Sequence, residues 1–182
     1  MERVWKIFLL GVIFCITSSC EDNDEWKGII AERIGTELVL PEGLVCYNNI
    51  KDGGEIGGEL QRGRAKIIVY INGECMACVD QFSQWEKKWD DFTELDKVSI
   101  LIYVRTQDVE ELKRYIKDIG FSHPFFIDPK SDLLFNNKIP YDKPLLHTFL
   151  LDQYNKIVLV GSPIGNMRLE NLYKQEILRL IE

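Results

Sequence analysis

The sequence is short of histidine, of positive charge and of long apolar runs. Its 182 residues include two histidines, and its 22 lysines and arginines are outnumbered by 29 aspartates and glutamates. The net charge of −7 argues against a nucleic-acid partner, because basic residues that neutralise phosphates supply most of that affinity. No apolar run approaches the roughly 20 residues that a membrane-spanning helix needs. What remains is the composition of an ordinary globular domain.

The longest apolar run, Ile7–Ile16, lies close to the start of the sequence and follows Arg3 and Lys6. A positively charged start with a short apolar region is typical of an export signal. We therefore predict that residues 1–19 form a signal peptide.

Cys20 follows three small residues, Thr17, Ser18 and Ser19. This arrangement resembles the lipobox of bacterial lipoproteins, which implies that Cys20 is lipidated and anchors the chain to a membrane. The alternative is an ordinary secretory signal in which Cys20 has no role.

An acidic run, EDNDE at 21–25, comes directly after Cys20. It resembles the surface-export signal of Bacteroidetes lipoproteins, and a solvated acidic tether over 20–27 is the alternative. Both interpretations place the protein in the cell envelope, as a lipoprotein of the outer membrane facing either the periplasm or the surface.

Three of the five cysteines lie beyond the signal and the lipidation site: Cys46, Cys75 and Cys78. Cys75 and Cys78 form a C-x-x-C pair, which has redox consequences in the oxidising environment of an exported protein. An odd total leaves one thiol unpaired or only transiently paired. Cys46 lies in an apolar segment, and we predict that it is buried in a strand, with a role as a redox partner as the alternative.

A metal centre is not predicted, because structural zinc needs more ligands than one C-x-x-C supplies. The sequence has no second such pair, and its histidines are His123 and His147. A site built from the three cysteines and one histidine is the alternative.

The C-x-x-C pair is predicted to lie where a strand turns into a helix. Residues 66–71 (KIIVYI) are apolar and rich in branched side chains, which indicates a buried strand, and Asn72 and Gly73 interrupt it. Helical spacing then links Cys78, Phe82, Trp85, Trp89 and Phe92, and we expect this stripe, including both tryptophans, to face the core.

This placement gives the two cysteines different roles. The free N–H groups at a helix start stabilise an anion, so the pKa of Cys75 should lie below that of a free thiol. Cys78, one turn further on, can attack a mixed disulfide formed on Cys75. Glu74 acts in the opposite sense, since a neighbouring carboxylate disfavours the thiolate. No basic residue adjoins the motif in the sequence, which predicts a reductant rather than a strong oxidant.

Two segments resemble the thioredoxin superfamily, in particular its redoxin-type, TlpA/ResA-like thiol–disulfide proteins of bacterial envelopes. They are KIIVYINGECMACVDQF at 66–82 and HTFLLDQYNKIVLVGSP at 147–163, and the resemblance covers about 66–182. It implies an α/β fold, a three-layer sandwich with a central mixed β-sheet and helices on both faces.

The domain organisation follows from these segments. We expect a signal peptide (1–19), an acidic tether (20–27), a lead-in with a glycine-rich loop (28–65) and a thioredoxin-like domain (66–182). Within that domain the pattern predicts strands at 98–104, 124–127, 148–151 and 157–160, and helices over 109–119 and 169–180. Asp108 is suited to cap the first of these helices and Gly120 to end it.

The sequence departs from the resembled family at three places. Tryptophan usually precedes the motif, where this chain has Glu74. The family's cis-proline before the hairpin strand corresponds to Leu146, with Pro144 two residues earlier. The family's buried acid, six residues before the first cysteine, corresponds to Val69. Glu74, Leu146 and the adjacent His147 are therefore candidates for lining the substrate groove or tuning Cys75.

The leading functional interpretation is a lipid-anchored thiol–disulfide oxidoreductase that needs no cofactor. Cys75 would be the nucleophile and Cys78 the resolving thiol, with oxidised envelope proteins as substrates and a separate electron donor. One alternative is a non-catalytic binding lipoprotein with a structural disulfide. A peroxidase is the other, although Asn72 stands where peroxiredoxins place threonine or serine.

Overall fold

A computed structural model describes residues 21–48, 51–52, 62–93 and 97–182. The chain divides into two compact units, residues 1–34 and 35–182. The predicted signal peptide, Cys20 and most of the glycine-rich loop lie outside the described residues. In the first unit, Glu21–Arg33 forms helix α2, which the sequence did not indicate because no apolar stripe runs through it.

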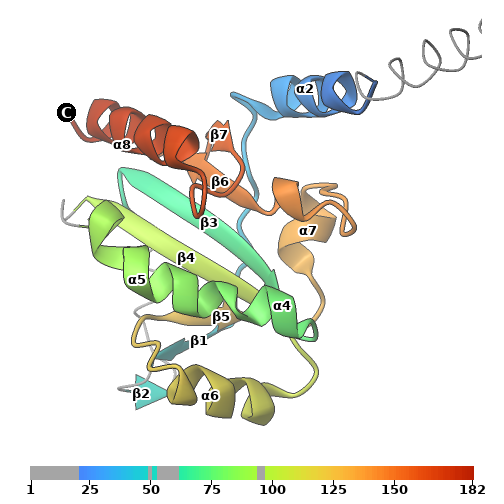
Figure 1. The fold of residues 1–182 in the computed structure, drawn as a ribbon, viewed down its shortest axis with the longest axis vertical. Helices are drawn as coiled ribbons and strands as arrows, with labels where there is room; N and C mark the ends of the chain where they lie inside the picture. Colours follow the sequence, from blue (N-terminus) through green and yellow to red (C-terminus); the bar gives the residue numbers. More distant parts are fainter. Residues whose placement is uncertain (1–20, 49–50, 53–61, 94–96) are drawn as a thin grey trace, which may run out of the picture. The chain divides into compact units, whose positions relative to one another are not determined.

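The second unit is built on one mixed sheet of seven strands, in the order β2-β1-β5-β4-β3-β6-β7 (Figure 1). The three central strands β5, β4 and β3 run parallel, and every other pairing is antiparallel. The strands are β1 (Val45–Asn48), β2 (Lys51–Asp52), β3 (Ala65–Asn72), β4 (Val98–Arg105), β5 (Phe125–Ile127), β6 (Thr148–Leu151) and β7 (Ile157–Val160). Two strands from the predicted lead-in, β1 and β2, thus extend the sheet.

Helices connect and cover these strands. They are α4 (Met76–Val79), α5 (Gln81–Thr93), α6 (Val109–Asp118), α7 (Asp132–Asn136), the 3-10 helix η1 (Pro144–Leu146) and α8 (Met167–Ile181). Asp108 caps α6, its side chain accepting from the Glu111 N–H, and Gly120 has the positive φ that ends a helix. The predicted strands and helices of 98–180 are confirmed.

The main core lies between one face of the sheet and helices α5, α6 and α8. Alternate residues of β3, such as Val69 and Ile71, point to this face, as the two-residue period of a strand requires. Trp85 and Trp89 of the predicted stripe are buried here. The apolar stripe therefore serves packing, as expected. The intervening residues of β3, such as Tyr70, point to the other face of the sheet. There the Tyr70 hydroxyl is hydrogen-bonded to Ser131, at the start of α7.

Lys66 is a charged residue buried on that second face. Its Nζ donates to the carbonyls of Gly63 and Gln153, each at 3.2 Å. Burial lowers the pKa of Lys66, against the attraction of Asp152. The ammonium ties the start of β3 to the β6–β7 turn.

Candidate redox site

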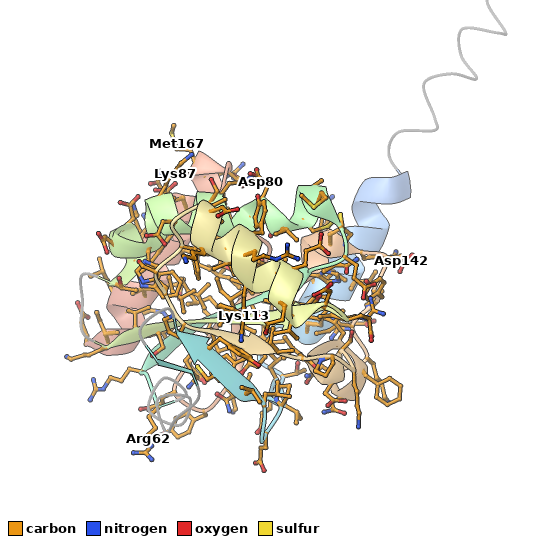
Figure 2. The ribbon with its side chains drawn as sticks, turned by 90° about the horizontal axis from the view of Figure 1, so that it is seen from below. Arg62, Asp80, Lys87, Lys113, Asp142 and Met167 are labelled. Atoms are coloured by element: carbon orange, nitrogen blue, oxygen red, sulfur yellow. A yellow bond between two sulfur atoms is a disulfide. The ribbon has the colours of Figure 1, made fainter. Side chains whose placement is uncertain are left out.

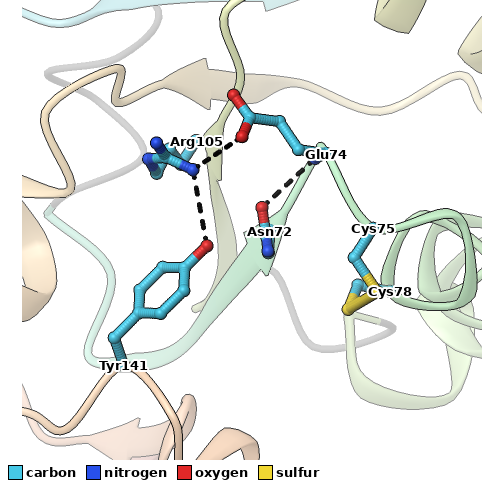
Figure 3. The surroundings of a disulfide bond; sticks show 6 residues. All are labelled: Asn72, Glu74, Cys75, Cys78, Arg105 and Tyr141. Atoms are coloured by element: carbon cyan, nitrogen blue, oxygen red, sulfur yellow. Dashed lines mark hydrogen bonds and ion pairs between the residues drawn. A yellow bond between two sulfur atoms is a disulfide. The ribbon is translucent and has the colours of Figure 1, made fainter.

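Cys75 and Cys78 form a disulfide at the point where β3 gives way to helix (Figure 3). Their Cα atoms are 5.1 Å apart. Cys75 is the last residue before α4, and its carbonyl accepts from the N–H groups of Cys78 and Val79. Both cysteines are partly exposed. The predicted strand–turn–helix placement is confirmed, with a nucleophile candidate at the surface and its partner one turn away.

Gly73 allows the turn before Cys75 to lie against the end of β4. Its N–H donates to the Arg105 carbonyl at 2.7 Å. A Cβ built on Gly73 would lie 2.8 Å from that oxygen and 3.1 Å from Thr106 Cβ. Only glycine lets the turn and the end of β4 approach this closely. The contact fixes the position of the residues that follow Gly73.

Glu74 is paired with a base that the sequence did not indicate. Arg105, the last residue of β4, places Nη1 2.9 Å from Glu74 Oε2 and 3.4 Å from the Tyr141 hydroxyl (Figure 3). The expectation that no basic residue offsets Glu74 is therefore wrong. Parallel pairing of β3 with β4 brings Asn72 opposite Arg105, so two residues distant in sequence meet beside the motif.

The helix behind the cysteines is broken. The sequence predicted one helix through the apolar stripe, whereas α4 ends at Val79 and α5 begins at Gln81, with Asp80 between them. Asp80 nevertheless keeps helical backbone angles, its N–H donates to the Met76 carbonyl at 3.2 Å, and its carbonyl accepts from the Gln84 N–H at 3.4 Å. The helical path behind Cys75 therefore continues through this interruption.

Leu146, a candidate for lining the substrate groove, is not at the surface. It is fully buried at the end of η1, which Pro144 starts, and the described residues contain no cis peptide bond. Val69, at the position of the resembled family's buried acid, faces the apolar core.

His147 is buried, and its ring is hydrogen-bonded within the protein. Its Nε2 lies 3.1 Å from the Pro140 carbonyl, and its ring packs edge-on against Tyr70. Burial lowers the pKa of His147, against the effects of the Pro140 bond and Asp142. Burial also raises the pKa of Tyr70 to about 12. The bonded imidazole is thus neutral near pH 7 and holds the loop before β6.

Two other polar residues, Asp128 and Cys46, are buried in the sheet domain. Asp128 is fully buried and accepts from the N–H groups of Asp132 and Leu133 at 2.8 and 3.0 Å, so it caps α7. Cys46 is a buried, unbonded thiol in β1, as predicted, and burial raises its pKa.

A groove of about 450 Å³ runs beside the disulfide, between α4 and the start of α6. Met76 and Val79 line it from α4, and Leu112 and Tyr115 line it from α6. Figure 2 views the domain from the side of α6, on which Lys113 is labelled. No sequence pattern pointed to this groove, since its walls come from segments that meet only in the fold.

Two features are absent from the described part of the chain. No three side chains of histidine, cysteine, aspartate or glutamate gather there as metal ligands. Among the same residues, no helix is long and apolar enough to cross a membrane.

The architecture and the position of the disulfide define a thioredoxin-like fold. No protein-family model matches the sequence, and no curated protein sequence matches it either. The likeness is found among solved structures, all below 20% identity in the examples that follow, and it establishes the fold.

One such structure is a protein of Chlorobium tepidum assigned as the thiol:disulfide interchange protein DsbE, with a TM-score of 0.58 and 12% identity over 82% of this chain and 98% of that one. The thioredoxin domain of a thiol-disulfide oxidoreductase from Bacteroides vulgatus gives a TM-score of 0.55 with 14% identity, over 77% and 97% of the two chains. StoA from Bacillus subtilis gives 0.51 with 19% identity, over 75% and 99%.

Proposed function

We propose that this protein is a thiol–disulfide oxidoreductase of the bacterial cell envelope that reduces disulfides in other exported proteins. One observation carries the proposal: Cys75 and Cys78 are bonded, partly exposed, and lie at the end of a central strand of a thioredoxin-like fold. A pair buried in the core would be inert, whereas this pair is accessible to an incoming thiolate and, once reduced, to a substrate disulfide.

The proposed reaction is a two-step exchange. In the reduced protein the Cys75 thiolate attacks a substrate disulfide, forming a mixed disulfide and releasing one substrate sulfur as a thiolate. Cys78 then attacks the Cys75 sulfur, which closes the Cys75–Cys78 disulfide and releases the second substrate thiolate. The substrate gains two electrons and two protons. A donor protein carrying a dithiol returns the pair to its reduced form by the same exchange.

The reducing direction is proposed from the charges beside Cys75. Strong oxidants have a thiolate that is heavily stabilised in the reduced form. Here Glu74, the residue next to Cys75, is neutralised by Arg105. This ion pair does not supply the net positive field that a strong oxidant needs.

Equilibration with thiol–disulfide buffers tests this proposal. A working pair should have a reduction potential above about −300 mV, and a structural disulfide lies below that value. The measurement uses a background in which Cys15, Cys20 and Cys46 are all changed to serine, so that the only thiols that change state are those of the C-x-x-C pair. A potential below this limit would overturn the proposal.

Trapping in cells provides the second test. Cys78→Ser should accumulate mixed disulfides on Cys75, because the resolving step is blocked. The matched control is Cys75→Ser, which keeps Cys78 but removes the nucleophile and should trap nothing. Equal trapping by both variants would contradict the assignment of Cys75 as the nucleophile.

A non-catalytic binding domain with a structural disulfide is the second candidate. Two observations favour it: Val69 provides no proton acceptor behind the motif, and Leu146 is buried where the resembled family lines its substrate groove. The reduction potential of the Cys75–Cys78 pair separates the two functions, because only the oxidoreductase requires a reducible pair.

We also propose that Cys20, which lies outside the described residues, anchors the protein to the membrane through lipid. Labelling cells with radioactive palmitate should mark the wild-type protein and not Cys20→Ser. Cys15→Ser is the matched control and should keep the label. Label on Cys20→Ser would contradict the anchor without bearing on the redox pair.

A further inference from the structure

The groove between α4 and α6 combines an apolar floor with an acidic rim. Val79 and Leu112 are almost fully buried in its floor, at 3% and 4% exposure, while Met76 is 70% exposed at its edge. Glu74 and Glu111 are among its carboxylates. No lysine or arginine occurs among the described residues that line it.

The groove also adjoins the reactive sulfur. Glu74 and Met76 are the two neighbours of Cys75 in the chain, and both line it. An extended chain advances about 3.3 Å per residue. A substrate bonded through its own cysteine to Cys75 therefore places a residue one or two positions away over this groove.

The three carboxylates of the rim differ in their existing partners. Glu74 is paired with Arg105 at 2.9 Å. Asp108 uses Oδ1 to accept from the Glu111 N–H at 2.8 Å, as the cap of α6. The Glu111 carboxylate makes no ion pair with the described residues that surround it. The rim thus keeps a net negative charge after its internal pairing.

We infer that this groove binds a lysine or arginine side chain of the substrate polypeptide, next to the substrate's reactive cysteine. The long aliphatic stem of either residue can cover Val79 and Leu112 while its charged end remains at the wet rim near Glu111. Complementary charge at such a rim acts mainly on specificity and on the rate of encounter. The inference rests on the proposed oxidoreductase function and names the substrate class of that same site.

Single-turnover reduction of two synthetic peptides tests the inference. Each peptide carries one cysteine linked to thionitrobenzoate and differs only in having arginine or glutamate two residues from that cysteine. The Cys75 thiolate of the pre-reduced protein attacks the peptide sulfur of the probe disulfide and releases coloured thionitrobenzoate, and closure of Cys75–Cys78 then releases the peptide thiol. At low ionic strength the arginine peptide should react about tenfold faster, and added salt should reduce the difference.

Three variants locate the effect. Glu111→Gln and Asp108→Asn should each reduce the preference for the arginine peptide about threefold. Asparagine still caps a helix, so the second change spares α6. Glu110→Gln is the matched control: it removes the same charge one residue away, where Glu110 pairs with Lys113 and does not line the groove, and the preference should stay.

A small neutral disulfide, hydroxyethyl disulfide, separates the two proposals. The control Glu110→Gln, which lies outside the groove, should reduce it at the wild-type rate. Failure to reduce it with wild type would overturn the oxidoreductase function itself. Reduction of this compound together with equal rates for the two peptides, or an equal effect of Glu110→Gln and Glu111→Gln, would overturn the groove alone.

Discussion

The guanidinium of Arg105 lies 2.9 Å from the carboxylate of Glu74, the residue that directly precedes the first cysteine of the redox pair. The pairing replaces a single negative charge beside Cys75 with a neutral ion pair. It follows from the parallel register of β3 and β4, in which Asn72 and Arg105 are partners.

Arg105→Met should slow the reaction of reduced Cys75 at neutral pH, because an unpaired Glu74 carboxylate raises the pKa of the thiol. Both residues are partly exposed, so we expect a modest effect, about threefold in rate. Alkylation by iodoacetamide across pH, in a background that lacks Cys15, Cys20, Cys46 and Cys78, measures it. Glu74→Gln should act in the opposite direction.

The double variant Arg105→Met with Glu74→Gln should react at nearly the wild-type rate, since the two changes act through one pair. Arg114→Met, in the exposed part of α6, is the control and should have no effect. A double variant that stays as slow as Arg105→Met would show that the slowing does not arise from the unpaired Glu74 carboxylate.

Asp128→Asn should destabilise the fold and leave thiol reactivity unchanged. The carboxylate accepts two N–H groups at the start of α7, and an amide supplies one acceptor oxygen in place of two. A loss of about 1–3 kcal/mol in the free energy of unfolding is expected, measured with urea. Slower attack of Cys78 on the mixed disulfide at Cys75, with stability unchanged, would instead make Asp128 a proton acceptor.

Gly73→Ala should strain the turn before the redox pair. The added Cβ would lie 2.8 Å from the Arg105 carbonyl, so the turn or the end of β4 must shift, and we expect a loss of about 1–3 kcal/mol. Urea unfolding measures it. Gly28→Ala, where nothing lies within 4 Å of the new atom, should lose no stability; a harmless Gly73→Ala would disprove the close packing.

His147→Phe should flatten the pH dependence of stability below about pH 6.5. A buried histidine with a lowered pKa takes up a proton more readily in the unfolded chain. The wild-type fold is therefore most stable above the unfolded-state pKa and loses stability as pH falls towards the folded-state pKa.

The same variant also loses the hydrogen bond to the Pro140 carbonyl, which should destabilise it by about 1 kcal/mol at neutral pH. Phenylalanine keeps the edge-on contact with Tyr70. Unfolding by urea at several pH values measures both effects. Identical slopes for wild type and variant would show that His147 does not titrate differently in the folded state.

The regular elements were predictable because each carries its own signal. Buried runs such as 98–104 and the helical stripe through Trp85 and Trp89 are set by local periodicity, and Asp108 and Gly120 mark helix ends. Helix α2 was missed because it has no apolar stripe. The break at Asp80 was missed because Cys78 and Phe82 keep helical spacing across it.

The candidate site was predictable only in its covalent part. The C-x-x-C spacing indicates the two sulfurs, whereas the neighbours of Cys75 depend on which strands pair. Arg105 reaches Glu74 through strand register, and Leu112 faces Val79 only because α6 packs beside α4. Charges brought together by tertiary structure leave no pattern along the chain.

The buried position of Cys46 has a consequence for the order in which the protein is made and folded. Its strand β1 pairs with β5, where Phe126 is the partner of Cys46. Residues of β5 are synthesised well after Cys46, Cys75 and Cys78. Until then, in the export proposed above, each of these three thiols can pair with either of the other two. Correct pairing of the redox cysteines therefore depends on completing the sheet before Cys46 is captured, and Cys46→Ser should raise the yield of active protein under oxidative refolding.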